Sequence, residues 1–247
     1  MPDTPAMAYF PLTTDQDPIG VLEFRTAQTL TQEQVRLVCS ILRVYRNFHG
    51  LLDYSERDTL TGLLNRKTFD ESFMRVGAAL PPTAGAAVGD ARRHAPRGSA
   101  WLGVIDTDHF KRVNDGHGHL IGDEVLLLLS RLMRTSFRCH DHLYRFGGEE
   151  FVVLLRCNQP QDAALAFERL RSHVERYQFP QVGQITVSVG LSKLRSDDTP
   201  SSGFERADRA VYHAKQNGRN QVAHHAELVA SGQLIEAVRD RSDAELF

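Results

Sequence analysis

Residues 145–151, Arg145-Phe146-Gly147-Gly148-Glu149-Glu150-Phe151, form the stretch that decides the fold. Apolar runs of β-forming residues flank it, at 142–144 before it and at 151–155 after it. Two adjacent glycines can both take positive φ without strain. The stretch therefore predicts a β-hairpin whose turn holds Gly147 and Gly148.

Two carboxylates follow the glycines directly, an arrangement that a turn serving only the fold would rarely have. Glu149 and Glu150 repel each other, and one of them must enter a buried strand. A divalent cation would relieve this repulsion, and carboxylate oxygens are ligands that suit magnesium. The glycines would also let a bulky ligand lie close to the backbone. The alternative interpretation is an exposed turn with two solvated acids.

The composition is that of a globular protein, with 247 residues of which 41% are hydrophobic and 24% are charged. A formal net charge of −2 gives no basic field, so we expect no nucleic-acid binding. No run reaches the roughly eighteen apolar residues that span a membrane, and the first residues lack the pattern of a secretion signal. The three cysteines include no Cys-x-x-Cys pair, which predicts free thiols and a cytoplasmic location.

The N-terminal segment predicts an arm and not a domain. Residues 1–30 hold short apolar pieces, enough for a strand or two but too few to enclose a core. A helix is expected to begin near 31–34 and to carry one apolar stripe at three- and four-residue steps: Val35, Val38, Ile41, Leu42, Tyr45, Phe48 and Leu52. The stripe could pack locally or against the same helix of a second chain, and we favour dimerisation.

The middle of the chain predicts a helix, a loop and a buried strand. Asn65 is a reasonable N-cap for a helix over 66–79. Residues 81–100, rich in Pro, Gly, Ala and Arg, are expected to form a surface loop. An apolar strand over 101–105 then brings Asp106 to its end, where open α/β sheets tend to place ligand chemistry.

The remaining elements complete an α+β order. Asp108 and Asp115 are interpreted as turn caps, and Gly122-Asp123 is expected to precede a strong helix. After the hairpin come, in order, a helix over 161–177, an alternating strand over 184–191, a helix over 204–216, a short strand at Val222 and a helical tail from 226. The resulting β-α-β-β-α-β order predicts a palm-like or ferredoxin-like central antiparallel sheet flanked by helices.

Five motifs together resemble the GGDEF domain of bacterial diguanylate cyclases. They are Asp58-x-Leu60-Thr61-Gly62-Leu63-x-Asn65-Arg66, Asp106-x-Asp108-His109-Phe110-Lys111-x-x-Asn114-Asp115, Gly118-His119-x-x-Gly122-Asp123, the hairpin stretch, and Ala207-Asp208-x-Ala210-x-Tyr212-x-Ala214-Lys215-x-x-Gly218-Arg219-Asn220. The hairpin carries Glu149 where many members carry Asp, which keeps the carboxylate. The resemblance implies a nucleotide-cyclase-like domain over 58–225, preceded by an arm and linker helix over 1–57 and followed by a helical tail over 226–247.

Such enzymes condense two GTP molecules, one per subunit of a homodimer, into cyclic di-GMP with loss of two pyrophosphates. The resemblance assigns catalysis to Asp106, Glu149 and Glu150. The same three side chains and the backbone carbonyl of Thr107 would hold Mg²⁺ or Mn²⁺, with two ions per site. Phosphoryl transfer needs charge neutralisation and alignment more than covalent help, which suits this residue set.

The resemblance also implies a GTP site. Asn114 and Asp123 match the guanine-reading pair, in which a carboxylate accepts from guanine N1–H and the 2-amino group, as adenine would not allow. Without the resemblance, Asp123 would be interpreted as a helix N-cap. Lys215 and Arg219 would be interpreted as positive charges that stabilise the C-terminus of a helix. The full set of predicted GTP contacts is Asn114, Asp123, the backbone around Phe110 and Lys111, Gly147, Gly148, Lys215 and Arg219.

Arg138-Cys139-His140-Asp141 stands at the spacing of the family's Arg-x-x-Asp product-inhibition site. The resemblance implies feedback inhibition by cyclic di-GMP at Arg138 and Asp141, with Arg169 as a secondary contact. The first fifty-odd residues resemble the last strands and exit helix of a GAF domain, which fits a signalling arm and an upstream sensor or regulatory partner. The alternative hypotheses are a non-catalytic receptor of cyclic di-GMP or GTP, and a polymerase-like palm, which the missing basic channel disfavours.

Overall fold

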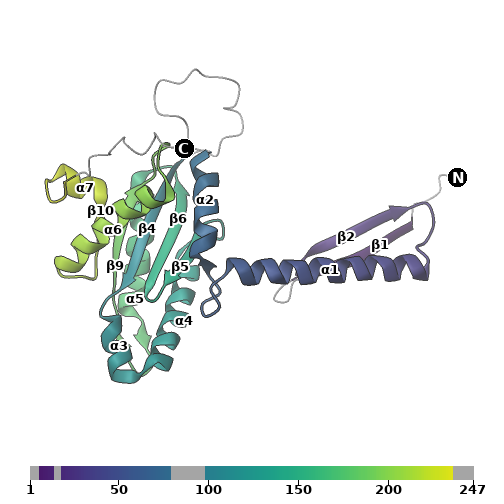
Figure 1. Cartoon of the computed structure of the whole chain (residues 1–247), viewed down its shortest axis with the longest axis horizontal. Coiled ribbons are helices and arrows are strands. Elements are labelled where there is room, and N and C mark those ends of the chain that lie inside the picture. Colours follow the sequence, from purple (N-terminus) through teal and green to yellow (C-terminus); the bar gives the residue numbers. More distant parts are fainter. Residues whose placement is uncertain (1–5, 14–17, 79–97, 236–247) are drawn as a thin grey trace, which may run out of the picture. The chain divides into compact units, whose positions relative to one another are not determined.

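The computed structural model describes residues 6–13, 18–78 and 98–235 (Figure 1). Most of the predicted loop over 81–100 lies outside these residues, as does the end of the predicted tail beyond 235. Among the helices that the structure describes, none combines the length and the apolar character needed to cross a lipid bilayer.

The chain divides into two compact units, Met1–Arg57 and Asp58–Phe247. In the first unit, β1 (Ala6–Thr13) and β2 (Pro18–Thr26) pair antiparallel, and α1 (Gln32–Glu56) follows them. The rings of Phe10 and Phe24 meet edge to face with centroids 5.7 Å apart, and Phe10 is buried. The predicted strands and helix are present, while the resemblance of this arm to the end of a GAF domain stays a prediction.

α1 carries two apolar faces and not the single predicted stripe. Val35, Val38 and Leu42 are half-buried, and α1 contacts β1. Ile41 and Phe48 are exposed, because at about 100° per residue they stand roughly 120° and 140° around the helix from Val35. They belong to a second row whose members are all exposed and follow at steps of four and three residues: Leu37, Ile41, Val44, Phe48 and Leu51.

A mixed six-stranded sheet forms the centre of the second unit (Figure 1), in the order β10-β9-β4-β6-β5-β3. Its strands are β3 (Leu64–Asn65), β4 (Ser99–Thr107), β5 (His142–Gly147), β6 (Glu150–Cys157), β9 (Val187–Lys193) and β10 (Val222–His224). The inner strands β9, β4, β6 and β5 pair antiparallel, which confirms the predicted central sheet. The edge strands β10 and β3 join it in parallel, and a separate small pair is formed by β7 (Gln178–Phe179) and β8 (Gly183–Gln184).

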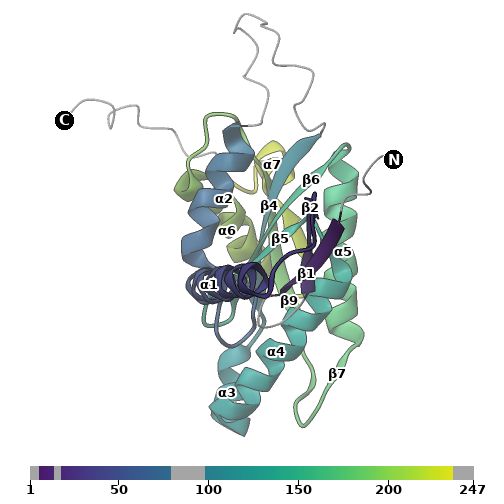
Figure 2. The ribbon, with the colours of Figure 1, turned by 90° about the vertical axis from the view of Figure 1, so that its right-hand side faces the viewer.

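Helices cover both faces of this sheet (Figure 2). They are α2 (Arg66–Ala78), α3 (Phe110–His117), α4 (His119–Ser136), α5 (Pro160–Arg176), α6 (Pro200–Gln216) and α7 (His225–Ala230). One core cluster joins α4 and α5 to Ile105 of β4, and a second joins α2 and α6 to Leu102 and Val104 of the same strand. Burial on both faces explains why the inner strands are continuous apolar runs in the sequence.

Side-chain caps set where two of these helices begin. Asn65 caps α2 as predicted, since its Oδ1 accepts from the backbone N–H of Thr68 at 3.1 Å. α6 begins earlier than predicted, at Pro200. There the Thr199 hydroxyl accepts from the Ser202 amide at 3.1 Å, and the Ser202 hydroxyl accepts from the Thr199 amide at 3.0 Å.

Two other predicted boundaries are wrong. Gly122-Asp123 does not precede a helix, because α4 already begins at His119 and contains both residues. Gly122 serves packing, since a Cβ at this position would lie 2.0 Å from Asn114 Oδ1. The strand predicted from 184 begins only at Val187, because Gln184 belongs to β8 and pairs with β7 instead.

Candidate active site

The hairpin turn between β5 and β6 is held by an arginine. Gly147 and Gly148 have φ values of 148° and 50°, as the adjacent glycines predict. Arg145 donates to the Gly148 carbonyl from Nη2 at 2.9 Å and from Nε at 3.2 Å. Its Nη1 lies 3.0 Å from Asp58 Oδ1. The segment before α2 therefore fixes the turn that carries the acidic pair.

Two paired strands bring the acidic residues to one end of the sheet. Asp106 lies directly opposite Glu150 in the register of β4 and β6. The amide and the hydroxyl of Thr107 both donate to the backbone carbonyl of Glu149, each at 3.3 Å. All four predicted metal-site residues therefore gather at this end, around the last two residues of β4.

The carboxylates are short of compensating positive charge. Burial raises the pKa of Asp106 even though Lys215 Nζ lies 2.7 Å from its Oδ2. Burial and the nearby charge of Asp106 also raise the pKa values of Glu149 and Glu150. Asp106 Oδ1 is buried and has no hydrogen-bond partner among the described residues. A further cation would therefore stabilise this cluster.

The donor set fits a divalent metal ion. Carboxylate and carbonyl oxygens are the ligands that Mg²⁺ and Mn²⁺ prefer, and the Oδ1 atom of Asp106 is available for one. Within the part of the chain that the structure describes, no three His, Cys, Asp or Glu side chains stand close enough to form a metal site by themselves. Lys215 holds the other oxygen of Asp106, so this ion pair would have to rearrange around a metal ion.

An open cavity of about 240 Å³ lies beside the carboxylates, and it shows a residue that the sequence analysis did not assign. Asp106, Glu150, Tyr212 and Lys215 line this cavity together with Asp208. Burial raises the pKa of Asp208, which adds a fourth acidic group to the site. The available signal was its spacing, since Lys215 follows Asp208 by seven positions, about two helical turns, which places both on one side of α6.

The predicted guanine-reading pair comes from two helices that pack on each other, α3 and α4. Asn114 on α3 lies against Gly122, one residue before Asp123 on α4. Asp123 is exposed inside α4, so its interpretation as an N-cap is wrong. Phe110 begins α3 and is buried, whereas Lys111 is exposed.

Lys215 and Arg219 take different places. Lys215 stands near the end of α6 and pairs with Asp106. Arg219 follows Gly218 in the next turn, has a φ of 62°, and is exposed. Its guanidinium makes no hydrogen bond or ion pair with any residue that the structure describes. The structure therefore brings only Lys215 to the carboxylates.

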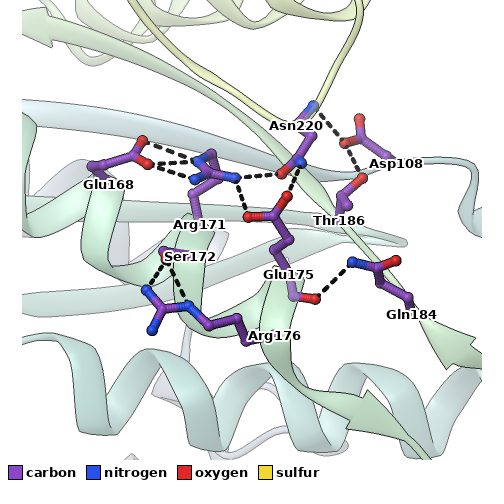
Figure 3. A network of polar contacts seen from close by, with 9 residues as sticks. All are labelled: Asp108, Glu168, Arg171, Ser172, Glu175, Arg176, Gln184, Thr186 and Asn220. Atoms are coloured by element: carbon purple, nitrogen blue, oxygen red, sulfur yellow. Dashed lines mark hydrogen bonds and ion pairs between the residues drawn. The ribbon is translucent and has the colours of Figure 1, made fainter.

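Asp108 is buried and does not cap a turn, which corrects the interpretation from sequence. Its carboxylate accepts from the Thr186 hydroxyl at 2.7 Å and from the backbone amide of Asn220 at 3.0 Å (Figure 3). It also accepts from the Ser188 hydroxyl at 2.7 Å. Asp108 thereby joins the segment after β4 to β9 and to the turn after α6.

The predicted inhibitory residues meet near the end of α4. Arg138 and Asp141 form one compact turn, in which the Asp141 amide donates to the Arg138 carbonyl at 3.0 Å and the Arg138 amide donates to Asp141 Oδ2 at 2.9 Å. Arg169 reaches over from α5, where its Nε donates to the Ser136 carbonyl at 3.0 Å. Ser136 is the last residue of α4, two residues before Arg138.

A mixed sheet with antiparallel inner strands, flanked by helices and with acidic strand ends beside a lysine, defines an α+β domain whose site is suited to cations and phosphates. The sequence profile of the family described as "Diguanylate cyclase, GGDEF domain" matches residues 55–221. The chain belongs to this family, which confirms the resemblance seen in its motifs.

Individual relatives agree with the family match. Diguanylate cyclase DgcP of Pseudomonas aeruginosa is 39% identical over 182 residues, which cover 71% of this chain and 25% of that protein. Diguanylate cyclase DgcZ of Escherichia coli is 34% identical over 170 residues, covering 68% and 52%. The coiled coil and GGDEF domain of DgcB from Caulobacter crescentus, solved with c-di-GMP, has a TM-score of 0.64 at 27% identity and covers 78% of this chain and 100% of that one. The chain spans a quarter to about half of the two curated relatives.

Proposed function

We propose that this chain is a diguanylate cyclase, which condenses two GTP molecules into cyclic di-GMP and releases two pyrophosphates. The observation that carries the proposal is the arrangement of Asp106, Glu149 and Glu150 at the ends of two paired strands, with Lys215 on Asp106. Carboxylates in this number would repel a triphosphate unless cations stood between them, and metal-assisted phosphoryl transfer has that requirement. The names of DgcP and DgcZ state the same activity for those relatives.

In this mechanism the chain's own residues bind and align. Asp106, Glu149, Glu150 and the backbone carbonyl of Thr107 would hold Mg²⁺ or Mn²⁺, two ions per site. Bound there, the ions would neutralise the triphosphate and lower the pKa of the attacking 3′-hydroxyl. Lys215 would exchange Asp106 for the β- and γ-phosphates, because an ammonium group binds phosphate oxygens by charge-assisted hydrogen bonds.

The rest of the GTP site surrounds this centre. Asp123 and Asn114 would read the guanine edge, since a carboxylate accepts from the two N–H donors that adenine lacks at those positions. The backbone amides around Phe110 and Lys111 would bind phosphate oxygens, as oriented N–H groups do at the start of a helix. Arg219, whose guanidinium is free of described partners, would bind the outer phosphates.

Catalysis would require a homodimer, because one domain binds one of the two reacting nucleotides. The 3′-hydroxyl of each GTP would attack the α-phosphate of the GTP held by the other chain. Gly147 and Gly148 leave room for this meeting, since a Cβ built on either would find no atom within 4 Å. The open space above the turn supports a nucleotide lying close to the backbone.

Cyclic di-GMP would inhibit its own synthesis by binding at Arg138, Asp141 and Arg169. A guanidinium and a carboxylate in one turn offer both a phosphate partner and a guanine acceptor. The exposed free thiols of Cys39 and Cys139 support the proposed cytoplasmic location, because exposed thiols persist in reducing compartments. An upstream sensor or regulatory partner of the N-terminal arm stays a prediction.

Incubation of the purified chain with GTP and Mg²⁺, followed by nucleotide separation, tests the proposal. We expect cyclic di-GMP and pyrophosphate in a one-to-two ratio. Glu149→Gln should lower the rate at least about a hundredfold while GTP binding persists, since it removes one charge from the metal-binding set. Glu71→Gln, which changes an exposed acid on α2, is the matched control and should keep the rate. Binding of labelled cyclic di-GMP without synthesis would favour a receptor instead.

A further inference from the structure

The turn that carries Arg219 has an uncommon backbone conformation. Gly218, Arg219 and Asn220 have φ values of 105°, 62° and 45°, so two successive residues with side chains occupy the left-handed region. Residues other than glycine adopt this region rarely, because Cβ crowds the backbone there. Such a conformation persists only where surrounding contacts hold it.

Asn220 provides those contacts with its backbone amide and with both polar atoms of its side chain. Its backbone amide donates to Asp108 Oδ2 at 3.0 Å. Its side-chain Oδ1 accepts from Arg171 Nη1 at 2.8 Å, and its Nδ2 donates to Glu175 Oε1 at 2.7 Å. Figure 3 shows Asn220 between Asp108 on one side and the two α5 residues on the other. The residue next to Arg219 is thus fixed from two directions.

Arg171 uses four of its five N–H donors within this network. Its Nε and Nη2 donate to Glu168 at 2.8 Å and 2.6 Å, and its Nη1 is shared between Glu175 at 2.9 Å and Asn220. Only 14% of the Arg171 side chain is exposed. Two carboxylates of α5 therefore orient this guanidinium toward Asn220.

Asp108 connects the same turn to the candidate active site. It stands two residues after Asp106 and two before Phe110, so it belongs to the segment assigned to metal and phosphate binding. Its three accepted hydrogen bonds, from Thr186, Ser188 and Asn220, fix that segment and the Arg219 turn against each other.

We propose that Arg171 and Glu175 are positioning residues for phosphate binding, which hold Asn220 and so present Arg219 to the β- and γ-phosphates of the substrate. The proposal rests on the proposed function, in which Arg219 is a phosphate ligand. It assigns a role to a partly buried face of α5 that none of the predicted site residues occupies, since Arg169 on the same helix contacts Ser136 instead.

Two nucleotides test this role in the full chain. The first is the GTP analogue with a methylene bridge between the α- and β-phosphates, which keeps the outer phosphates but does not turn over, and the second is GMP, which lacks those phosphates. Arg171→Ala should weaken binding of the analogue by roughly tenfold, the scale of a lost hydrogen bond to a charged group, and leave GMP binding unchanged. The KM for GTP should rise in the same proportion as the analogue's Kd, with kcat changed much less.

Arg219→Ala and the double variant complete the test. If Arg171 acts through Arg219, the double variant should bind the analogue no more weakly than Arg219→Ala alone. Arg176→Ala is the matched control, because Arg176 lies on the same helix and its guanidinium hydrogen-bonds only to Ser172 among the described residues (Figure 3). Arg171→Lys keeps a cation beside Glu168 and Glu175 but lacks the fork that reaches Asn220, so it carries the test if Arg171→Ala does not fold.

The outcomes separate this inference from the proposed function. Three outcomes would each overturn the positioning role. In Arg171→Ala, the affinities for GMP and for the analogue could fall equally, or neither could differ from wild type. In the double variant, the losses of affinity for the analogue could be additive. A chain that binds neither nucleotide before any substitution would overturn the proposed function itself. A chain that makes cyclic di-GMP and binds the analogue normally after Arg171→Ala and Arg171→Lys would keep the function and lose the inference.

Discussion

Asp58 shows how one side chain outside the site can hold its central turn. Its Oδ1 accepts from the amide and hydroxyl of Thr61 at 2.8 Å and 2.7 Å and from Arg145 at 3.0 Å. Burial alone would raise the pKa of Asp58, but these hydrogen bonds and the charge of Arg145 outweigh it, so the pKa lies below its usual value. A lowered pKa means that the carboxylate stabilises the fold above its unfolded-state pKa, near 4, and loses that contribution as pH falls through the folded-state value.

We therefore predict that Asp58→Asn lowers the free energy of unfolding by about 1–2 kcal/mol at pH 7, the scale of a partly buried charged hydrogen bond. The difference in unfolding free energy between Asp58→Asn and wild type should shrink as pH falls below about 4, because protonation removes the Asp58 charge from the wild-type chain as well. Urea unfolding between pH 7 and pH 3 measures it. Asp115→Asn, at an exposed position in α3, is the control and should show little difference at any pH. A difference that stays constant with pH would contradict the account.

Arg138 allows a second test at the scale of one residue. Its side chain is exposed and lies outside the carboxylate cluster, at the turn that follows α4. Arg138→Ala should therefore keep the initial rate of cyclic di-GMP synthesis and raise the product concentration needed for half inhibition by roughly tenfold or more, since a charged phosphate contact is lost. Progress curves with added cyclic di-GMP measure both. Unchanged inhibition would remove Arg138 from the inhibitory site.

At the scale of elements, two glycines allow helices α5 and α6 to pack closely against the sheet. A Cβ on Gly190 of β9 would lie 2.0 Å from the Ala207 carbonyl oxygen of α6, which is backbone. A Cβ on Gly103 of β4 would lie 2.1 Å from the ring of Phe167 on α5, which is a side chain. A side chain can turn away, whereas a helix backbone must move as a whole, so the two positions differ in tolerance.

We expect Gly190→Ala to destabilise the chain by about 3 kcal/mol or more, and Gly103→Ala by about 1–3 kcal/mol. Phe167→Leu should recover part of the loss in the Gly103→Ala background and none in the Gly190→Ala background. Gly116→Ala in α3 is the control, since a Cβ there meets nothing within 4 Å, and it should be neutral or stabilising by up to about 1 kcal/mol. Urea unfolding measures the stability of each variant. Equal losses of stability in Gly103→Ala and Gly190→Ala would contradict the expected difference between a side-chain contact and a backbone contact.

Elements with a local cause could be predicted from sequence. The hairpin follows from Gly147 and Gly148, and the start of α2 follows from the Asn65 cap. The start of α4 could not be predicted in this way, because Gly122 looks like a helix break and is in fact required by contact with Asn114 on another helix. A residue whose reason lies in tertiary packing gives no reliable local signal.

At the scale of the whole molecule, the candidate active site shows the same difference between local signals and tertiary contacts. The acidic pair after the glycines and Asp106 after an apolar run were found because each stands beside a recognisable strand. The bond from Asn220 to Asp108 spans 112 residues of sequence, and only the fold shows that these two residues meet. Sequence could therefore supply the ligands of the proposed metal site but not the network that positions them.

Dimerisation is the property of the whole molecule on which the proposed chemistry depends. The exposed row on α1 has the steps of a heptad seam, and its members are Leu37, Ile41, Val44, Phe48 and Leu51. A row of this kind stabilises a coiled coil when two helices pair along it, because each apolar side chain then fills a gap on the partner. The opposite face of α1 is already half-buried, which leaves this row for a second chain.

Phe48→Glu should weaken the dimer at least about tenfold, because pairing would bury an unpartnered carboxylate in the seam. The synthesis rate per chain should then fall at low protein concentration and recover as concentration rises, since the active site itself is unchanged. Light-scattering mass and initial rates over the same concentration range measure both effects. Arg36→Glu also adds negative charge to α1 but lies outside the row, so it should change neither. If Phe48→Glu is monomeric and still keeps the full rate at nanomolar concentration, catalysis across a dimer would be contradicted. If Phe48→Glu stays dimeric, the exposed row on α1 is not the dimer interface.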